Sequence, residues 1–88
     1  MQDKTMDQKD QILNNIVIRV SKEDSSFVYF IFESNEGMCF YSTLKSSMHK
    51  DYRDVSINFT PEFTEDVERT LNILSNKFPV EYLSKEIS

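Results

Sequence analysis

The amino-acid sequence predicts an α+β domain, and three observations support this prediction. An alternating strand pattern at 55–60 is followed directly by an amphipathic helical stripe at 61–77. The 88 residues include one glycine and two prolines, so few tight turns are available for a many-stranded sandwich or barrel. A hydrophobic content of 39% and an aromatic content of 12% argue against a globally disordered chain.

The N-terminal part of the chain is polar and then becomes strand-like. Residues 1–11 lack an amphipathic period, so we expect a disordered N-terminal tail and one α+β domain over 12–88. At 16–20, isoleucine and valine on one side alternate with Val17 and Arg19 on the other. This alternation predicts the first strand.

The next stretch is so rich in aromatic and aliphatic side chains that two interpretations are open. As a strand it would form a hairpin with 38–44, and the fold would be a β-meander with one C-terminal helix. As a helix over 22–36 it would begin with Ser21 and Asp24 in a capping-box arrangement and end near Gly37, where a positive φ is needed. The apolar face of that helix would consist of Phe27, Phe30, Ile31 and Ser34.

Further elements are expected along the rest of the chain. A second strand at 38–44 should place Cys39, Tyr41 and Thr43 on the same face as Val17. The charged segment 45–54 is expected to be a loop. In the third strand, at 55–60, the buried face should hold Val55, Ile57 and Phe59.

The C-terminal helix is predicted at 61–77. Thr60 can cap it, and Pro61 suits its first position because proline has no N–H to lose. Glu65 and Arg69 have the spacing of an i,i+4 ion pair. The core-facing stripe would consist of Phe63, Val67, Leu71, Leu74 and Phe78.

A short final strand is expected at 80–83, at an edge of the sheet, and 84–88 should fray. Assembled, the elements form a ferredoxin-like or ACT-like βαββαβ sandwich. In this arrangement two helices cover one face of an antiparallel four-stranded sheet.

Several short motifs follow one another along the chain: Arg19-Val20, Glu23-Asp24, the aromatic run at 27–33, Glu36-Gly37-Met38 and Ser42-Thr43-Leu44. Their order resembles the DUF4911 family, a small bacterial domain with no known activity. The resemblance covers residues 16 to 83 and implies a compact βαββα-type domain. The chain departs from the family in its longer, more charged 45–54 connection and in its polar N-terminal tail.

Charge and cysteine content exclude several classes of function. A net charge of −5 disfavours nucleic acid and anionic membranes as partners, because phosphate binding needs clustered lysine and arginine. One cysteine and one histidine cannot form an internal disulfide or a cysteine-rich zinc site, so we expect no metal and no cofactor. The chain has neither a membrane-spanning apolar run nor the apolar core of a signal peptide, and a cytoplasmic location is expected.

One local basic cluster is a candidate anion-binding loop. It consists of Lys45, His49, Lys50 and Arg53, and nearby aspartates cancel most of its charge. Cys39 has no base at a fixed spacing, so it is expected to be structural. Glu33 and Glu36 could act as an acid and base pair, yet a solvated helix end explains them equally well. No catalytic residue is therefore predicted.

The sheet face away from the helices is a candidate interface, formed by Val17, Tyr41 and Thr43. A homodimer is expected through this face or through the 80–83 edge. The leading hypothesis is a non-enzymatic interaction or small-ligand regulatory module. One alternative is a small enzyme, or an enzyme subunit, that uses the 45–54 loop. Another is single-stranded nucleic-acid binding with Tyr41 as a stacking platform, although the net charge argues against it.

Overall fold

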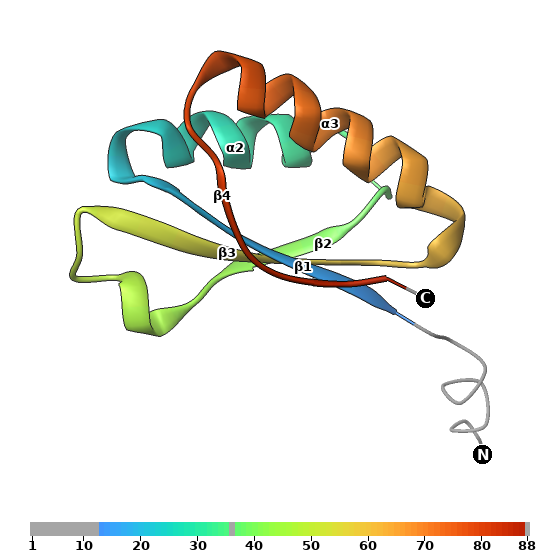
Figure 1. Ribbon diagram of the computed structural model, residues 1–88, viewed down its shortest axis with the longest axis horizontal. Helices are drawn as coiled ribbons and strands as arrows, with labels where there is room; N and C mark the ends of the chain where they lie inside the picture. Colours follow the sequence, from blue (N-terminus) through green and yellow to red (C-terminus); the bar gives the residue numbers. More distant parts are fainter. Residues whose placement is uncertain (1–12, 36, 88) are drawn as a thin grey trace.

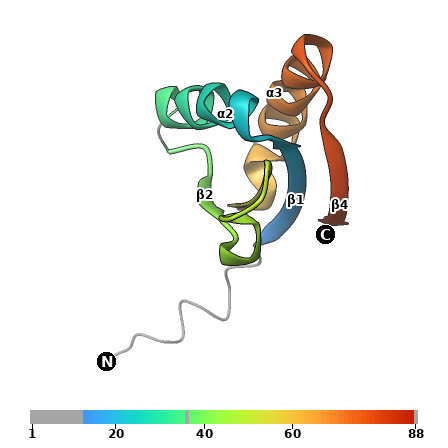
Figure 2. The same cartoon turned by 90° about the vertical axis from the view of Figure 1, so that its left-hand side faces the viewer.

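The chain folds into an α+β arrangement with a four-stranded antiparallel sheet and two α-helices. The computed structural model describes residues 13–35 and 37–87, so the tail expected at 1–11 lies outside the described residues. The strand order is β2-β3-β1-β4, and both helices lie on one side of the sheet (Figures 1 and 2). The elements are β1 Asn14–Ser21, α2 Lys22–Ser34, β2 Phe40–Thr43, β3 Tyr52–Phe59, α3 Thr64–Lys77 and β4 Glu81–Glu86.

The aromatic-rich stretch after β1 is a helix, which makes the β-meander alternative wrong. The Ser21 hydroxyl oxygen accepts a hydrogen bond from the Asp24 N–H at 3.1 Å, as the capping pattern predicted. The expected apolar face has the wrong phase, however. Val28 and Phe32 are buried against the sheet, whereas Phe30 is 61% exposed. The helix ends at Ser34, two residues earlier than expected.

The core lies between the central strands and the two helices. β1 and β3 pair along their whole length, with Ile16 opposite Ile57 and Ile18 opposite Val55. Paired residues point to the same face, so the alternation predicted for both strands builds one continuous apolar surface. Helix residues cover this surface. The buried apolar set is Ile16, Ile18, Val20, Val28, Phe32, Met38, Val55, Ile57, Phe59, Val67, Leu71 and Leu74.

The C-terminal helix is confirmed, with a different start. A short 3-10 turn at Pro61–Phe63 precedes the α-helix, which begins at Thr64. Thr60 forms no side-chain cap hydrogen bond. Phe63 is only half-buried, and the ion pair of Arg69 is with Asp66, at 3.0 Å, rather than with Glu65.

The connection between β2 and β3 is more ordered than the expected loop. β3 begins at Tyr52, and residues Lys45–Ser47 form a 3-10 turn. The buried Ser47 hydroxyl donates to the Leu44 carbonyl at 2.8 Å and accepts the Asp54 N–H at 3.0 Å. The connection lies on the side of the sheet opposite the helices (Figure 1).

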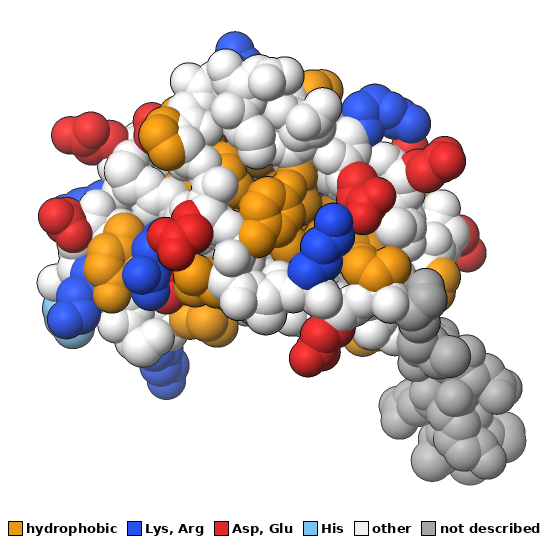
Figure 3. Space-filling model, in the orientation of Figure 1, with side chains coloured by type: hydrophobic (Ala, Val, Ile, Leu, Met, Phe, Trp, Pro, Cys, Tyr) orange, Lys and Arg blue, Asp and Glu red, His pale blue; other side chains and the backbone are white. Residues whose placement is uncertain are grey.

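The last strand is an edge strand, as expected, but it is longer than 80–83. It extends to Glu86, so the expectation that the chain frays from 84 is wrong for 84–86. All of its residues are exposed. Lys85 Nζ lies 3.2 Å from a Glu68 carboxylate oxygen on α3 and sits over the Tyr82 ring at 5.7 Å. Charged side chains lie among the hydrophobic ones on this face of the molecule (Figure 3).

Candidate functional site

Strand β2 has the opposite phase from the one predicted. Tyr41 pairs with Ile57 and therefore faces α2. Its ring stacks on Tyr29 with centroids 5.4 Å apart, and its hydroxyl donates to Glu33 at 2.5 Å. Thr43 lies on the same side and hydrogen-bonds the Tyr29 hydroxyl. The expectation that Tyr41 and Thr43 lie on the face away from the helices is therefore wrong.

The sheet face away from the helices, which we call the open face, is mainly polar along β1 and β3. Val17 does lie there, half-buried, beside Asn15, whose amide donates to Ser56 Oγ and Asn58 Oδ1 at 2.9 Å each. Along β1 and β3 this face therefore carries a hydrogen-bonded polar network.

A charged pair continues this network toward the β2–β3 connection. Arg19 donates to both carboxylate oxygens of Asp54, at 2.7 and 3.0 Å, and lies over the Tyr52 ring at 4.0 Å. The hydrogen bond with Asp54 raises the pKa of Arg19, so its charge is fixed. The pair ties β1 to β3.

In the basic cluster, three side chains are exposed and the fourth is engaged in hydrogen bonds to the backbone. Lys45, His49 and Lys50 are exposed. Arg53 is half-buried, and its Nη1 donates to the carbonyls of Ser47, Lys50 and Tyr52, at 3.1, 2.8 and 2.9 Å. This nitrogen holds the connection together, which weakens the case for an anion site there.

The residues considered for catalysis occupy unsuitable surroundings. Burial raises the pKa of the Cys39 thiol to about 11, which disfavours the thiolate at neutral pH. Glu33 accepts the Tyr41 hydroxyl, and Glu36 lies outside the described residues. Among residues 13–35 and 37–87, no three acidic, histidine or cysteine side chains gather where they could hold a metal ion. No helix in these ranges is long and apolar enough to cross a membrane.

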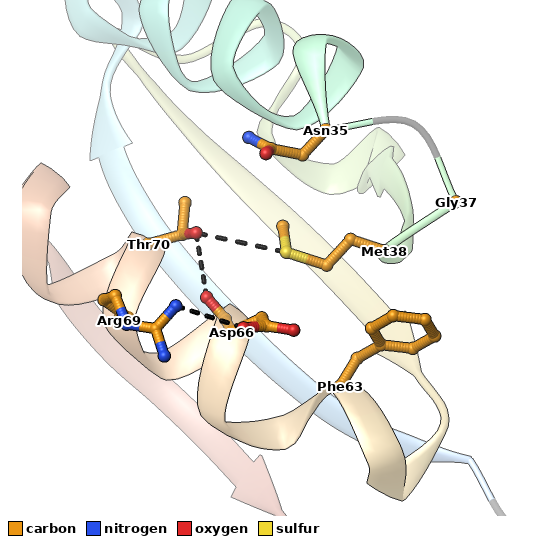
Figure 4. A pocket seen from close by; sticks show the side chains of 7 residues that line it. All are labelled: Asn35, Gly37, Met38, Phe63, Asp66, Arg69 and Thr70. Atoms are coloured by element: carbon orange, nitrogen blue, oxygen red, sulfur yellow. Dashed lines mark hydrogen bonds and ion pairs between the residues drawn. The ribbon is translucent and has the colours of Figure 1, made fainter.

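A pocket of about 470 Å³ lies between the turn that follows α2 and the first half of α3. Side chains from the two segments face each other across it (Figure 4). Its lining residues are Asn35, Gly37, Met38, Phe63, Asp66, Arg69 and Thr70.

The turn side of the pocket is fixed by the end of α2. Asn35 caps the helix, and its side-chain amide donates to the Ile31 carbonyl at 2.8 Å. The Met38 N–H then donates to the Asn35 carbonyl at 3.1 Å. Gly37 has a φ of +90°, as expected for this position, and an added Cβ would meet nothing within 4 Å. Glycine is needed there for its backbone conformation rather than for space.

The helix side of the pocket combines charge with an apolar surface. Asp66 and Arg69 form an ion pair whose side chains are 48% and 65% exposed. Thr70 donates to the Asp66 carbonyl at 2.9 Å, and its hydroxyl lies 4.0 Å from the Met38 sulfur. Together with Phe63, this arrangement offers an anion, a cation and an apolar wall to a small molecule.

The pocket could not be found from the sequence, because its two sides are more than 20 residues apart along the chain. The usable signals were the Gly37 turn and the charged first turns of the C-terminal helix, but neither indicates that they meet. A comparison with protein families, curated proteins and solved structures finds no match in any of the three.

Proposed function

We propose that this protein is a non-enzymatic small-ligand-binding module whose ligand occupies the pocket between the α2–β2 turn and α3. The observation that supports this proposal is a pocket of about 470 Å³ that joins an ion pair to an apolar wall. Ligand sites in proteins generally combine an apolar lining with a few polar groups in about 300–1,000 Å³.

The lining indicates the class of ligand. Arg69 uses Nη1 on Asp66 and remains largely exposed, so its guanidinium can also receive a carboxylate. The exposed Asp66 carboxylate can receive an ammonium group, and Met38 and Phe63 can pack against an aliphatic or aromatic part. A free amino acid has these three features.

The fold and the resemblance enter this proposal as analogy. The antiparallel order β2-β3-β1-β4, with a helix between β1 and β2 and another between β3 and β4, supports a ferredoxin-like or ACT-like sandwich. The resemblance to the DUF4911 family remains a prediction of the sequence. Neither determines a function, because one fold serves many.

The two alternative functions have weaker support. An enzyme using the 45–54 loop would depend on Arg53, whose Nη1 already binds three carbonyls. Nucleic-acid binding on the open face would lack Tyr41, which faces α2, and would face a net charge of −5.

A thermal-shift screen with amino acids and nucleotides tests the proposal. We expect at least one amino acid to raise the melting temperature, because a ligand at 100 times its Kd stabilises the fold by about 2.7 kcal/mol. Arg69→Gln should abolish that shift, since it removes the cation from the pocket.

Lys77→Gln is the matched control, because it removes one positive charge from the same helix outside the pocket lining. The ligand should raise the melting temperature of Lys77→Gln by as much as it raises that of the wild type, each measured against the same protein without ligand. A screen without any amino-acid shift, or a shift that Arg69→Gln leaves intact, would contradict the proposal.

A further inference from the structure

Strand β2 forms a free edge of the sheet. It lies at one end of the order β2-β3-β1-β4, as Figure 2 shows. Its four residues, Phe40–Thr43, carry no charge. Phe40 is 75% exposed, the most of any large hydrophobic side chain in the described residues, and Leu44 just after the strand is 36% exposed.

The hydrogen-bond alternation shows which backbone groups point outward. The Leu44 N–H donates to the Asp54 carbonyl at 2.8 Å, so the pair Leu44–Asp54 is hydrogen-bonded. In an antiparallel ladder such pairs alternate with pairs that are not hydrogen-bonded. By this alternation, the backbone groups of Phe40 and Ser42 also form hydrogen bonds with β3. The N–H and C=O groups of Tyr41 and Thr43 then point outward, away from β3, along the free edge.

The opposite edge is protected against pairing. β4 carries the charged residues Glu81, Lys85 and Glu86. Its pairing with β1 also shifts register between Val17 and Ile18, as at a β-bulge. Charged side chains and bulges are two of the means by which edge strands avoid association. β2 has neither protection, so the two edges differ in their capacity to pair.

We propose that β2 pairs in antiparallel fashion with β2 of a second copy of this chain, around a two-fold axis through Ser42. Tyr41 would exchange both backbone hydrogen bonds with Thr43 of the partner subunit, and Thr43 with Tyr41 of the partner subunit. The two sheets would then form one continuous antiparallel sheet with all four helices on one face.

This register follows from side-chain complementarity on the open face. It places Phe40 opposite Leu44 of the partner subunit, twice by symmetry, and both are exposed in the single chain. Ser42 then lies opposite Ser42 of the partner subunit. A shift by two residues in either direction would instead place Phe40 or Leu44 opposite Ser42 of the partner subunit, and both apolar pairs would be lost.

Charge also favours a second copy at this edge over other surfaces. Two chains with a net charge of −5 repel each other, so association is easiest where neither chain presents a charge. The strand Phe40–Thr43 meets this condition and β4 does not.

Sedimentation equilibrium over a micromolar range tests the proposal with the full chain. The wild type should have the mass of two chains. Ser42→Lys should raise the dimer dissociation constant at least about tenfold, because two like charges would meet on the axis. Ser84→Lys is the matched control, since Ser84 is an exposed serine on the open face of the other edge strand. It should leave the mass unchanged.

A single-chain mass for the wild type throughout this range would overturn the proposal. So would a Ser42→Lys variant that stays dimeric, or a Ser84→Lys variant that dissociates instead. Circular dichroism of each variant checks that its fold is intact.

A cross-linking experiment tests the register and does not depend on the lysine variant folding. The paired Ser42 positions would have Cα atoms about 4.5 Å apart, within disulfide range. In a Cys39→Ser background, Ser42→Cys should therefore form a covalent dimer on mild oxidation. Phe40→Cys in the same background should not, because its counterpart lies several residues away along the partner strand. No cross-link in the Ser42→Cys variant, or an equal one in the Phe40→Cys variant, would overturn the proposal.

Discussion

Tyr41 shows how a single side chain fixes the phase of a short strand. Phe40 and Tyr41 are adjacent aromatic residues that point to opposite faces of the strand, so the sequence pattern favours neither face for burial. The hydroxyl decides between them, because it reaches Glu33 on α2 while the ring packs against Tyr29 and Phe32. Phe40 has no such group and is left on the open face. The strand pattern alone could not reveal this choice.

The environment of Tyr41 predicts an unusual alkaline titration. The hydrogen bond to Glu33, followed by burial, raises the pKa of Tyr41 from 10.0 to about 12. The folded state therefore favours the neutral phenol. This contribution to stability is fully present below pH 10.0 and is lost as the pH rises through about 12. The ultraviolet absorbance of the phenolate measures the transition.

Tyr41→Phe provides the comparison, because the difference between its titration and that of the wild type isolates Tyr41 among the four tyrosines. We expect the difference to titrate near pH 12. A difference that titrates at the ordinary tyrosine pKa would show that the hydroxyl is not bonded to Glu33 in solution.

The helices and strands could be predicted from the sequence better than their faces. Ser21 and Asp24 identified the start of α2, because the cap is a local interaction between neighbouring residues. The buried face of α2 was misplaced, since apolar residues surround this helix and its orientation depends on the sheet. β3 shows the opposite case. Its clean alternation of Val55, Ile57 and Phe59 with polar residues leaves one possible face.

Helix α3 combines a local pattern with a clear core-facing stripe, which permits a matched pair of substitutions. Leu71 is fully buried and Ile73 is 50% exposed on the same helix. Leu71→Ala should lower the free energy of unfolding by about 2–4 kcal/mol, because it removes buried methyl groups and leaves a cavity. Ile73→Ala should lower it by less than about 1 kcal/mol. Urea denaturation measures both, and equal losses would contradict the assigned helix face.

The pocket and the free edge depend on how distant segments meet, and this is why the sequence could not predict them. Met38 and Thr70 become neighbours only when α3 lies against the turn that follows α2. The edge position of β2 follows from the strand order and cannot be found in Phe40–Thr43 itself.

The two proposals concern nearby but separate surfaces. Met38 lines the pocket and lies two residues before the start of β2. Arg69→Gln changes the pocket and leaves the edge strand unaltered, whereas Ser42→Lys changes the edge and leaves the pocket lining unaltered. Ligand binding and dimer formation can therefore fail independently in experiments.

The position of β2 in the sheet predicts an alternating pattern of amide hydrogen exchange. The amides of Ser42 and Leu44 bond β3 within one chain, so they should be protected in monomer and dimer alike. The amides of Tyr41 and Thr43 point from the free edge and should be protected only in the dimer. Residue-resolved exchange by nuclear magnetic resonance should show that Ser42→Lys removes the protection of Tyr41 and Thr43 alone. If these two amides stay protected in a variant that sediments with the mass of one chain, they are bonded within the chain, and β2 is not free to pair with a second copy.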